Sequence, residues 1–240
     1  DIDGEAALDR SGSSVSMNAT GDRVAIGATM NDGNGASSGH VRIYEWNGSS
    51  WTQLGQDIDG EAAYDGSGRS LSMNGVGDRV AIGTSGNDGN GPEAGHVRIY
   101  AWNGTSWVQE GQDIDGEASG DASGNSVSMN ASGNRLAIGA PGNDGNGSGA
   151  GHTRIYQWNV TSWVQLGQDI DGEAANDRSG RSVSMNGVGD RVAIGAHYND
   201  GNGYRSGHVR IYEWDGSSWI QQGQDIDGEA VGDESGFHHT

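Results

Sequence analysis

Acidic side chains recur at a fixed spacing along this chain. The string DIDGEA occurs five times, and a further Asp follows each copy three residues later. We call each such nine-residue segment a connector. Alternate residues of an extended segment face the same side, so the two leading Asp side chains point together and the Glu and last Asp can fold back toward them. Carboxylate oxygens are the ligands that Ca²⁺ prefers, so one interpretation is weak calcium binding. Its ligands would be Asp57, Asp59, Glu61, Asp65, Asp113, Asp115, Glu117, Asp121, Asp169, Asp171, Glu173 and Asp177.

The other interpretation of the connectors is a set of solvated turns. They carry 20 of the 33 acidic residues, and such charge keeps a β-protein from associating through its strand edges. The net charge is −20 and the chain contains no Lys. Binding to phosphate needs a basic surface, so nucleic acid is excluded as a partner and an anionic membrane surface is disfavoured.

Histidine and tryptophan also recur with the connectors. One His opens a β-rich segment after Gly in each repeat, at His40, His96, His152 and His208. These imidazoles could line a common site, or each could hydrogen-bond a neighbouring loop. Two Trp flank a short turn in each repeat and form either exposed platforms for sugars or packing between repeats. The platform interpretation assigns ligand binding to Trp46, Trp51, Trp102, Trp107, Trp158, Trp163, Trp214 and Trp219.

No pattern of residues indicates an enzyme. The chain has no Cys or Lys nucleophile, no G-x-S-x-G elbow and no H-E-x-x-H motif. Most candidate catalytic residues are repeated, whereas a catalytic site normally breaks symmetry. The unrepeated candidates for a hydrolase are His197 and Tyr198. The sequence therefore predicts a protein that is not an enzyme.

The connectors set a period of 56 residues. The repeats are 1–56, 57–112, 113–168 and 169–224, and residues 225–240 begin a fifth. Repeats of this kind bury an apolar face only against their neighbours, so we treat residues 1–240 as one domain. No run of about 18 apolar residues occurs, and insertion into a membrane is not expected.

Each repeat contains four segments with the alternation of β-strands. In the first repeat they are 13–18, 23–28, 40–46 and 51–58, and the Asn-Gly pair before the last one is typical of a hairpin turn. Gly-rich loops and the absence of helical periodicity indicate an all-β fold. Four antiparallel strands per unit of this length predict a β-propeller of four blades. The loops after the second strands and the connectors should share one end of it.

The repeat resembles the FG-GAP repeat of integrin α-type propellers. The similarity rests on the pattern S-G-x-S-V-S-M-N, R-V-A-I-G-A, G-H-V-R-I-Y-x-W and W-x-Q-x-G, which covers the whole chain. The "GAP" element is complete at 139–141, and the "FG" element reads Ser-Gly, as at Ser11 and Gly12. The family's calcium loop is replaced by NATGD at 18–22, so the resemblance implies the fold and not that metal site.

The resemblance also implies a function outside the cell or at its surface. We expect a non-catalytic binding or scaffold module for adhesion or display, with a protein or glycan ligand. The alternative is a multivalent lectin that uses the Trp-flanked hairpins. We expect the four blades to close into one ring; alternatively, two chains pair into an eight-bladed ring. Apart from the calcium of the connectors, no cofactor is indicated.

Overall fold

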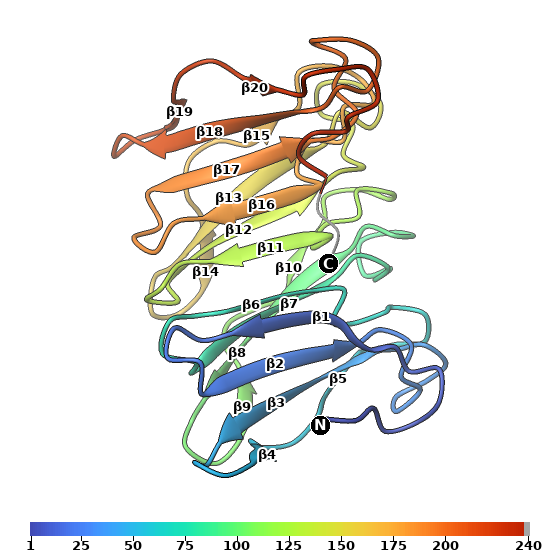
Figure 1. The fold of residues 1–240 in the computed structure, drawn as a ribbon, viewed down its shortest axis with the longest axis vertical. Helices are drawn as coiled ribbons and strands as arrows, with labels where there is room; N and C mark the ends of the chain where they lie inside the picture. Colours follow the sequence, from blue (N-terminus) through green and yellow to red (C-terminus); the bar gives the residue numbers. More distant parts are fainter. Residues whose placement is uncertain (238–240) are drawn as a thin grey trace.

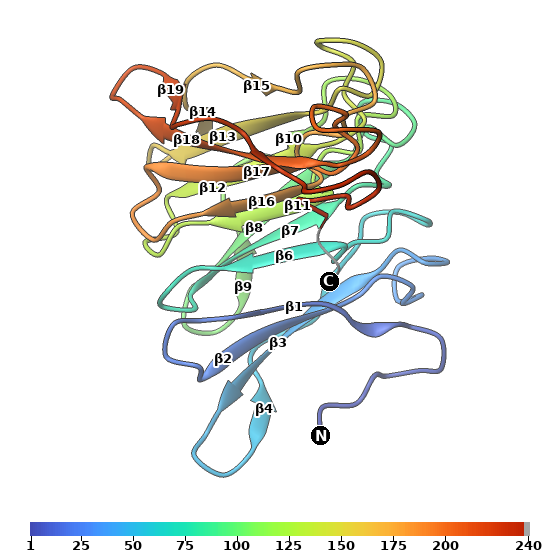
Figure 2. The same ribbon diagram turned by 45° about the horizontal axis from the view of Figure 1, so that its top comes forward.

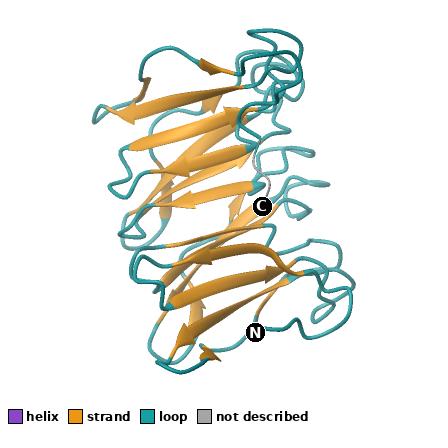
Figure 3. Cartoon of the chain, in the orientation of Figure 1, coloured by secondary structure: helices purple, strands orange, loops and turns teal. Residues whose placement is uncertain are grey.

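The computed structural model describes residues 1–237, and every regular element in that range is a β-strand (Figure 3). No helix capable of crossing a membrane is therefore found in this range. The strands form four sheets of five strands each, one for each 56-residue repeat. We call these sheets blades 1 to 4 in chain order. The prediction of an all-β propeller with four blades is confirmed.

Blade 1 shows the plan of all four. Its strands β1 to β4 pair antiparallel in chain order, and the short strand β5 pairs with the other end of β3. The strands of blade 1 are β1 (Ser11–Met17), β2 (Arg23–Ala28), β3 (His40–Trp46), β4 (Trp51–Gln53) and β5 (Ile58–Asp59). Those of blade 2 are β6 (Ser70–Met73), β7 (Arg79–Thr84), β8 (His96–Trp102), β9 (Trp107–Gln109) and β10 (Ile114–Asp115).

Blades 3 and 4 repeat this plan. Blade 3 consists of β11 (Ser126–Met129), β12 (Arg135–Ala140), β13 (His152–Trp158), β14 (Trp163–Gln165) and β15 (Ile170–Asp171). Blade 4 consists of β16 (Ser182–Met185), β17 (Arg191–Ala196), β18 (His208–Trp214), β19 (Trp219–Gln221) and β20 (Ile226–Asp227). The connectors and the loops after the second strands crowd together at one end of the blades, on the right in Figure 1.

The last strand of each blade differs from the prediction. A single strand over 51–58 was expected, but the structure divides it into β4 and β5, which pair with opposite ends of β3. Gly55 lies between them with a φ of 82°, a conformation that L side chains rarely adopt. Its α-carbon faces the indoles of Trp102 and Trp107 in blade 2. The break therefore makes room for the next blade.

Blades pack through two unlike faces. We call the face toward the preceding blade the leading face and the face toward the following blade the trailing face. The trailing face of blade 1 contributes small or aliphatic residues such as Ala25 and Ile43, and the leading face of blade 2 contributes Met73, Tyr100 and Trp107. The same pairing recurs between blades 2 and 3 and between blades 3 and 4. Each blade thus completes the core of its neighbour.

The four blades do not close into a ring in this structure. Blades 1 and 4 lie at opposite ends of the long axis in both Figure 1 and Figure 2. The first strands of consecutive blades contact one another, and across residues 1–237 no hydrogen bond or shared apolar cluster joins blade 4 to blade 1. The expectation of a closed single-chain ring is therefore not met here.

The connectors show why the arc can stay open. In a closed single-chain ring, the first and last copies would compete for one position. Instead, the first copy lies at the entry of blade 1, where Asp3 accepts a hydrogen bond from Arg42. The last copy lies at the exit of blade 4, where Ile226 pairs with Val209. Five connectors therefore flank four blades.

Close approach of the blades predicts a strong effect at Gly139. A Cβ at this position would overlap the carbonyl oxygen of Gly180 at the start of the next blade. We expect Gly139→Ala to lower the free energy of unfolding by roughly 2 kcal/mol or more, because backbone rather than a flexible side chain must move. Gly187→Ala is the control, since its Cβ would meet only the methyl group of Ala131 at 3.6 Å. Equal urea midpoints for the two variants would contradict this account.

Candidate functional site

Each of the three internal connectors links two blades. Its Ile-Asp pair forms the short strand on the blade that it leaves, as β5 does on β3. Its Glu reaches the blade that it enters: Glu61 Oε1 lies 3.4 Å from Arg98 Nη1. Arg98 also donates a hydrogen bond of 2.9 Å to the carbonyl oxygen of Asp59. The carboxylates of one connector are therefore divided between neighbouring blades.

This division brings a His together with carboxylates from two connectors. In blade 2, the Nδ1 atom of His96 lies 3.7 Å from Glu61 Oε2 and 4.0 Å from Asp113 Oδ2. Glu61 belongs to the connector that enters the blade, and Asp113 to the one that leaves it. One ligand atom from each residue lies within 4.8 Å of the others. The four such clusters are Glu5–His40–Asp57, Glu61–His96–Asp113, Glu117–His152–Asp169 and Glu173–His208–Asp225.

In blades 2 to 4 the electrostatics of the clusters favour a neutral imidazole, because burial lowers the pKa of His96, His152 and His208. His96 is 1% exposed, and burial, together with the nearby Arg98, lowers its pKa to about 4. Burial raises the pKa of Glu61, and the negative charge of Asp113 adds to that rise. Within residues 1–237, the Nε2 atom of His96 has no hydrogen-bond partner. The clusters of blades 2 to 4 thus each hold two carboxylates around an uncharged nitrogen.

The predicted ligands do not form one group per connector. Six of them lie in the clusters: Asp57, Glu61, Asp113, Glu117, Asp169 and Glu173. The other six, Asp59, Asp65, Asp115, Asp121, Asp171 and Asp177, lie outside them. Asp65 is buried and accepts hydrogen bonds from Asn87 Nδ2 and from the Ala62 N–H, both at 3.1 Å, so it closes the turn of the connector.

The structure therefore gives the cation prediction a different ligand set. Sequence reasoning treated the His residues separately, because His96 lies far from both carboxylates along the chain and only the pairing of His with the departing connector brings them together. Calcium binds oxygen ligands, whereas one imidazole with two carboxylates suits Zn²⁺, Co²⁺ or Mn²⁺. Calcium binding by the connectors remains a prediction, with transition metals the better match to the geometry.

The Trp residues lie mainly between the blades. Trp107 is buried, and its ring centroid is 5.5 Å from that of Trp102. Its Nε1 donates a hydrogen bond of 2.8 Å to the carbonyl oxygen of Leu54 in blade 1. Trp163 and Trp219 are buried in the same way. Trp46 is exposed and Trp51 is half-buried, since the structure places no blade against the leading face of blade 1. Trp102, Trp158 and Trp214 are half-buried as well, so the Trp platform for sugars remains a prediction, with Trp46 its most exposed member.

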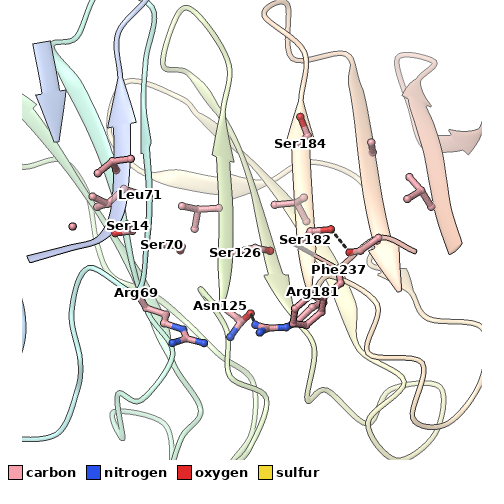
Figure 4. A pocket seen from close by; sticks show the side chains of 18 residues that line it. Ser14, Arg69, Ser70, Leu71, Asn125, Ser126, Arg181, Ser182, Ser184 and Phe237 are labelled. Atoms are coloured by element: carbon pink, nitrogen blue, oxygen red, sulfur yellow. Dashed lines mark hydrogen bonds between the residues drawn. The ribbon is translucent and has the colours of Figure 1, made fainter. Parts of the chain in front are cut away.

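A cavity of about 750 Å³ lies among the first strands of the four blades (Figure 4). Equivalent positions of successive repeats place Arg69, Asn125 and Arg181 at its rim. Arg181 donates a hydrogen bond to Asn125. Burial and the charge of Arg69 lower the pKa of Arg181. Among residues 1–237 the lining contains Arg, Asn and Ser side chains but no His or carboxylate, so these residues offer polar contacts to a ligand.

The unrepeated pair His197 and Tyr198 stacks at a centroid distance of 3.9 Å. His197 is buried and also contacts the ring of Phe237. Burial and three nearby Arg side chains lower the pKa of His197 to about 4. The charges that lower this pKa are all positive, and within residues 1–237 the Nδ1 atom of His197 has no hydrogen-bond partner.

The sequence matches one known repeat family. Residues 170–212 match the family model described as the FG-GAP repeat. The other three repeats carry the same pattern at a spacing of 56 residues. The chain is built from FG-GAP-like repeats. No curated protein matches its sequence as a whole.

Solved structures share the fold of these FG-GAP-like blades. Periplasmic gluconolactonase of Pseudomonas aeruginosa is 14% identical with a TM-score of 0.60, covering 92% of this chain and 58% of that one. Hydrazine synthase of Kuenenia stuttgartiensis is 9% identical with a TM-score of 0.56, covering 94% and 51%. The β-propeller domain of the trilobed protease of Pyrococcus furiosus is 12% identical with a TM-score of 0.51, covering 89% and 57%. The chain thus spans between half and three fifths of these structures, and the likeness shows the propeller fold alone.

The clusters lead to a prediction on metal binding. After treatment with chelator, we expect the chain to bind up to four Co²⁺ ions, with the visible absorption of a nitrogen- and oxygen-ligated ion. His96→Ala should remove one site, because it deletes the only nitrogen ligand of its cluster. His197→Ala, which changes a buried His outside the clusters, should leave the number of sites unchanged. Calcium in excess should not displace the cobalt. If no Co²⁺ binds at matched ionic strength, the prediction is wrong and the connectors are solvated turns.

The lowered pKa of His197 predicts a dependence of stability on pH. Unfolded His takes up a proton near pH 6.5, whereas folded His197 does so near pH 4. The unfolded chain therefore binds more protons in this window, and stability falls as the pH is lowered from about 6.5 to about 4. In urea titrations at pH 7 and pH 5, His197→Gln should lose less stability than the parent chain. An identical loss in both proteins would contradict a neutral, buried His197.

Proposed function

We propose that this chain is a non-catalytic binding and display module that works outside the cell or at its surface in adhesion. A constant β-scaffold presents one variable tip on each blade, and the tips together form the binding face. The FG-GAP-like repeats support an adhesive role. The observation that carries the proposal is where the four repeats differ from one another.

Among the most variable positions are two adjoining pairs in two loops. One pair of variable residues lies in the loop after the second strand, and the other lies in the following connector. The two pairs meet through a backbone hydrogen bond, as between the Tyr64 N–H and the Ala36 carbonyl oxygen at 2.7 Å. The tips of blades 1 to 4 are 36–37 with 63–64, 92–93 with 119–120, 148–149 with 175–176, and 204–205 with 231–232.

The bases of the tips are constant and well anchored. In blade 1, Asn34 Nδ2 donates a hydrogen bond of 2.8 Å to the carbonyl oxygen of Gly60. Asp32 Oδ1 accepts a hydrogen bond of 2.7 Å from the Ser37 N–H. Blade 2 repeats both contacts through Asn90 and Asp88. The variable residues therefore project from rigid loops, which is how binding residues are commonly held.

The side chains at the tips are present despite a conformational cost. Tyr64 has a φ of 70° and Arg205 a φ of 50°, although Gly occupies the equivalent of Tyr64 in blades 2 and 4. A left-handed non-Gly residue costs about 1 kcal/mol. Tyr64 is exposed, so packing does not offset that cost. A role in contacting a ligand explains why side chains occupy these positions.

Binding should therefore depend on the tips. The test variant carries Tyr64→Gly, Tyr204→Gly and Arg205→Gly, and the control carries Val160→Gly, an exposed residue with a φ of 81° in the hairpin at the opposite end. Tyr64, Arg205 and Val160 have a left-handed φ, so Gly relieves strain at these three positions, which offsets the loss of the contact between Arg205 and the Tyr198 ring at 4.1 Å. We expect both variants to keep a thermal stability close to that of the parent. Beads coated with the parent chain should be retained on a panel of extracellular proteins and polysaccharides, and only the tip variant should lose retention.

Two outcomes would contradict a binding face made of tips. One is unchanged retention by the tip variant. The other is retention on polysaccharide that persists in the tip variant and disappears on Trp51→Ala, which would support the lectin alternative. The opposite-end control separates either outcome from a general loss of folding.

A further inference from the structure

Blade 1 has an uncovered leading face. Val15 is 64% exposed and Met17 is 52% exposed, whereas the equivalent Val127 and Met129 of blade 3 are 8% and 7% exposed. The difference is one of position, because Val127 and Met129 lie in the core that blades 2 and 3 share. The equivalent residues of blades 2, 3 and 4 each form a core with the preceding blade. The leading face of blade 1 is therefore a docking surface without its partner.

Blade 4 has an uncovered trailing face. Ile226 is 54% exposed, whereas the equivalent Ile58 of blade 1 is 3% exposed. Ala193, Val209 and Ile211 are only half-buried, although their equivalents in blades 1 to 3 are fully buried. The two uncovered faces are therefore the two halves of one blade interface.

Polar groups at the two ends lack the same partners. Within the chain, the side-chain amide of Gln56 bonds both the N–H and the carbonyl oxygen of Trp107. Gln112 and Gln168 do the same for the Trp residues of blades 3 and 4. For Gln224 at the trailing end and for the Trp51 indole N–H at the leading end, the structure of residues 1–237 shows no hydrogen bond. Each end offers the groups that the other lacks.

We propose that the leading face of blade 1 docks onto the trailing face of blade 4 of a second copy of this chain. The three internal interfaces are the template for this junction, which is heterologous, since one copy contributes its head and the other its tail. Two such junctions between two copies close an eight-bladed ring, within the range known for propellers. A single copy holds these faces at opposite ends of the molecule (Figure 1).

Docking requires one connector to replace another. An internal junction contains one connector, whereas the junction between copies brings two, residues 225–233 of one copy and residues 1–9 of the other. The two share the string DIDGEA and the Asp three residues later. Residues 1–9 are held by two hydrogen bonds. Arg42 donates one of 2.8 Å to the carbonyl oxygen of Asp3, and Asn31 donates one of 2.9 Å to the carboxylate of Asp9. We expect residues 225–233 to take over these contacts and residues 1–9 to be displaced.

The first experiment measures mass by light scattering. It is run at rising concentration and in 0.15 M and 0.5 M salt, because the net charge of −20 opposes association at low ionic strength. We expect the mass to rise from 24.8 kDa toward twice that value, more readily at high salt. A mass of 24.8 kDa under all conditions would overturn the proposal, whether the single chain stays open or closes on itself.

Paired variants test the head-to-tail geometry. Met17→Asp disables the leading face and Ile226→Asp the trailing face, and both residues are exposed in the single chain, so folding should be kept. Each variant alone should stay monomeric. A 1:1 mixture should form a heterodimer, because each copy retains the face that the other lost. Val160→Asp, at an exposed position away from both faces, should associate like the parent.

Other outcomes of the mixture have clear meanings. If Met17→Asp stays monomeric while Ile226→Asp associates alone, two leading faces meet each other and the proposal is wrong. Deletion of residues 1–9 provides an independent test, because the displaced connector no longer competes. We expect a dissociation constant roughly tenfold lower than that of the parent, about the effect of one charge-assisted hydrogen bond. A weaker association after deletion would show that residues 1–9 belong to the junction.

Discussion

The fold depends on the packing of a bulky leading face against a smooth trailing face. Met, Tyr and Trp of one blade fill the space above Ala and aliphatic residues of the preceding blade. Gly on the trailing side, such as Gly27 against Gly68, lets backbones approach closely enough for this packing. Since only 32% of residues are hydrophobic, a single blade cannot bury enough apolar surface alone. Burial is therefore shared between neighbours, and both ends of the array remain unfinished.

The connectors extend the same dependence to the charges. Each internal connector forms a short strand on one blade and places a Glu near the Arg and His of the next. Neighbouring blades are thus joined by hydrogen bonds and ion pairs as well as by apolar contact. The exposed carboxylates still repel one another, which favours solubility and opposes association of the apolar ends. The same acidic segments therefore stabilise the array internally and limit its growth.

Symmetry separates constant from variable positions in this chain. Residues that repeat in all blades are mostly buried or hydrogen-bonded, including His96, Arg98 and Asp65. Several of the residues that vary project from the tips, where they adopt a left-handed backbone at a cost. The central cavity is intermediate, since equivalent positions carry Arg69, Asn125 and Arg181. Differences between otherwise equal repeats mark the places where contact with another molecule best explains the side chain.

The sequence by itself determined the repeats, the all-β class and most of the strands, because alternation and Gly-rich turns act over a few residues. It did not reveal the break at Gly55, which accommodates the Trp side chains of the next blade. Only the tertiary structure decided that Asp113 and Glu61 meet at His96 and that Trp107 is buried while the equivalent Trp51 is half-buried. These outcomes depend on which blade lies beside which, and identical local sequences at the ends and in the middle of the array carry no information about their neighbours.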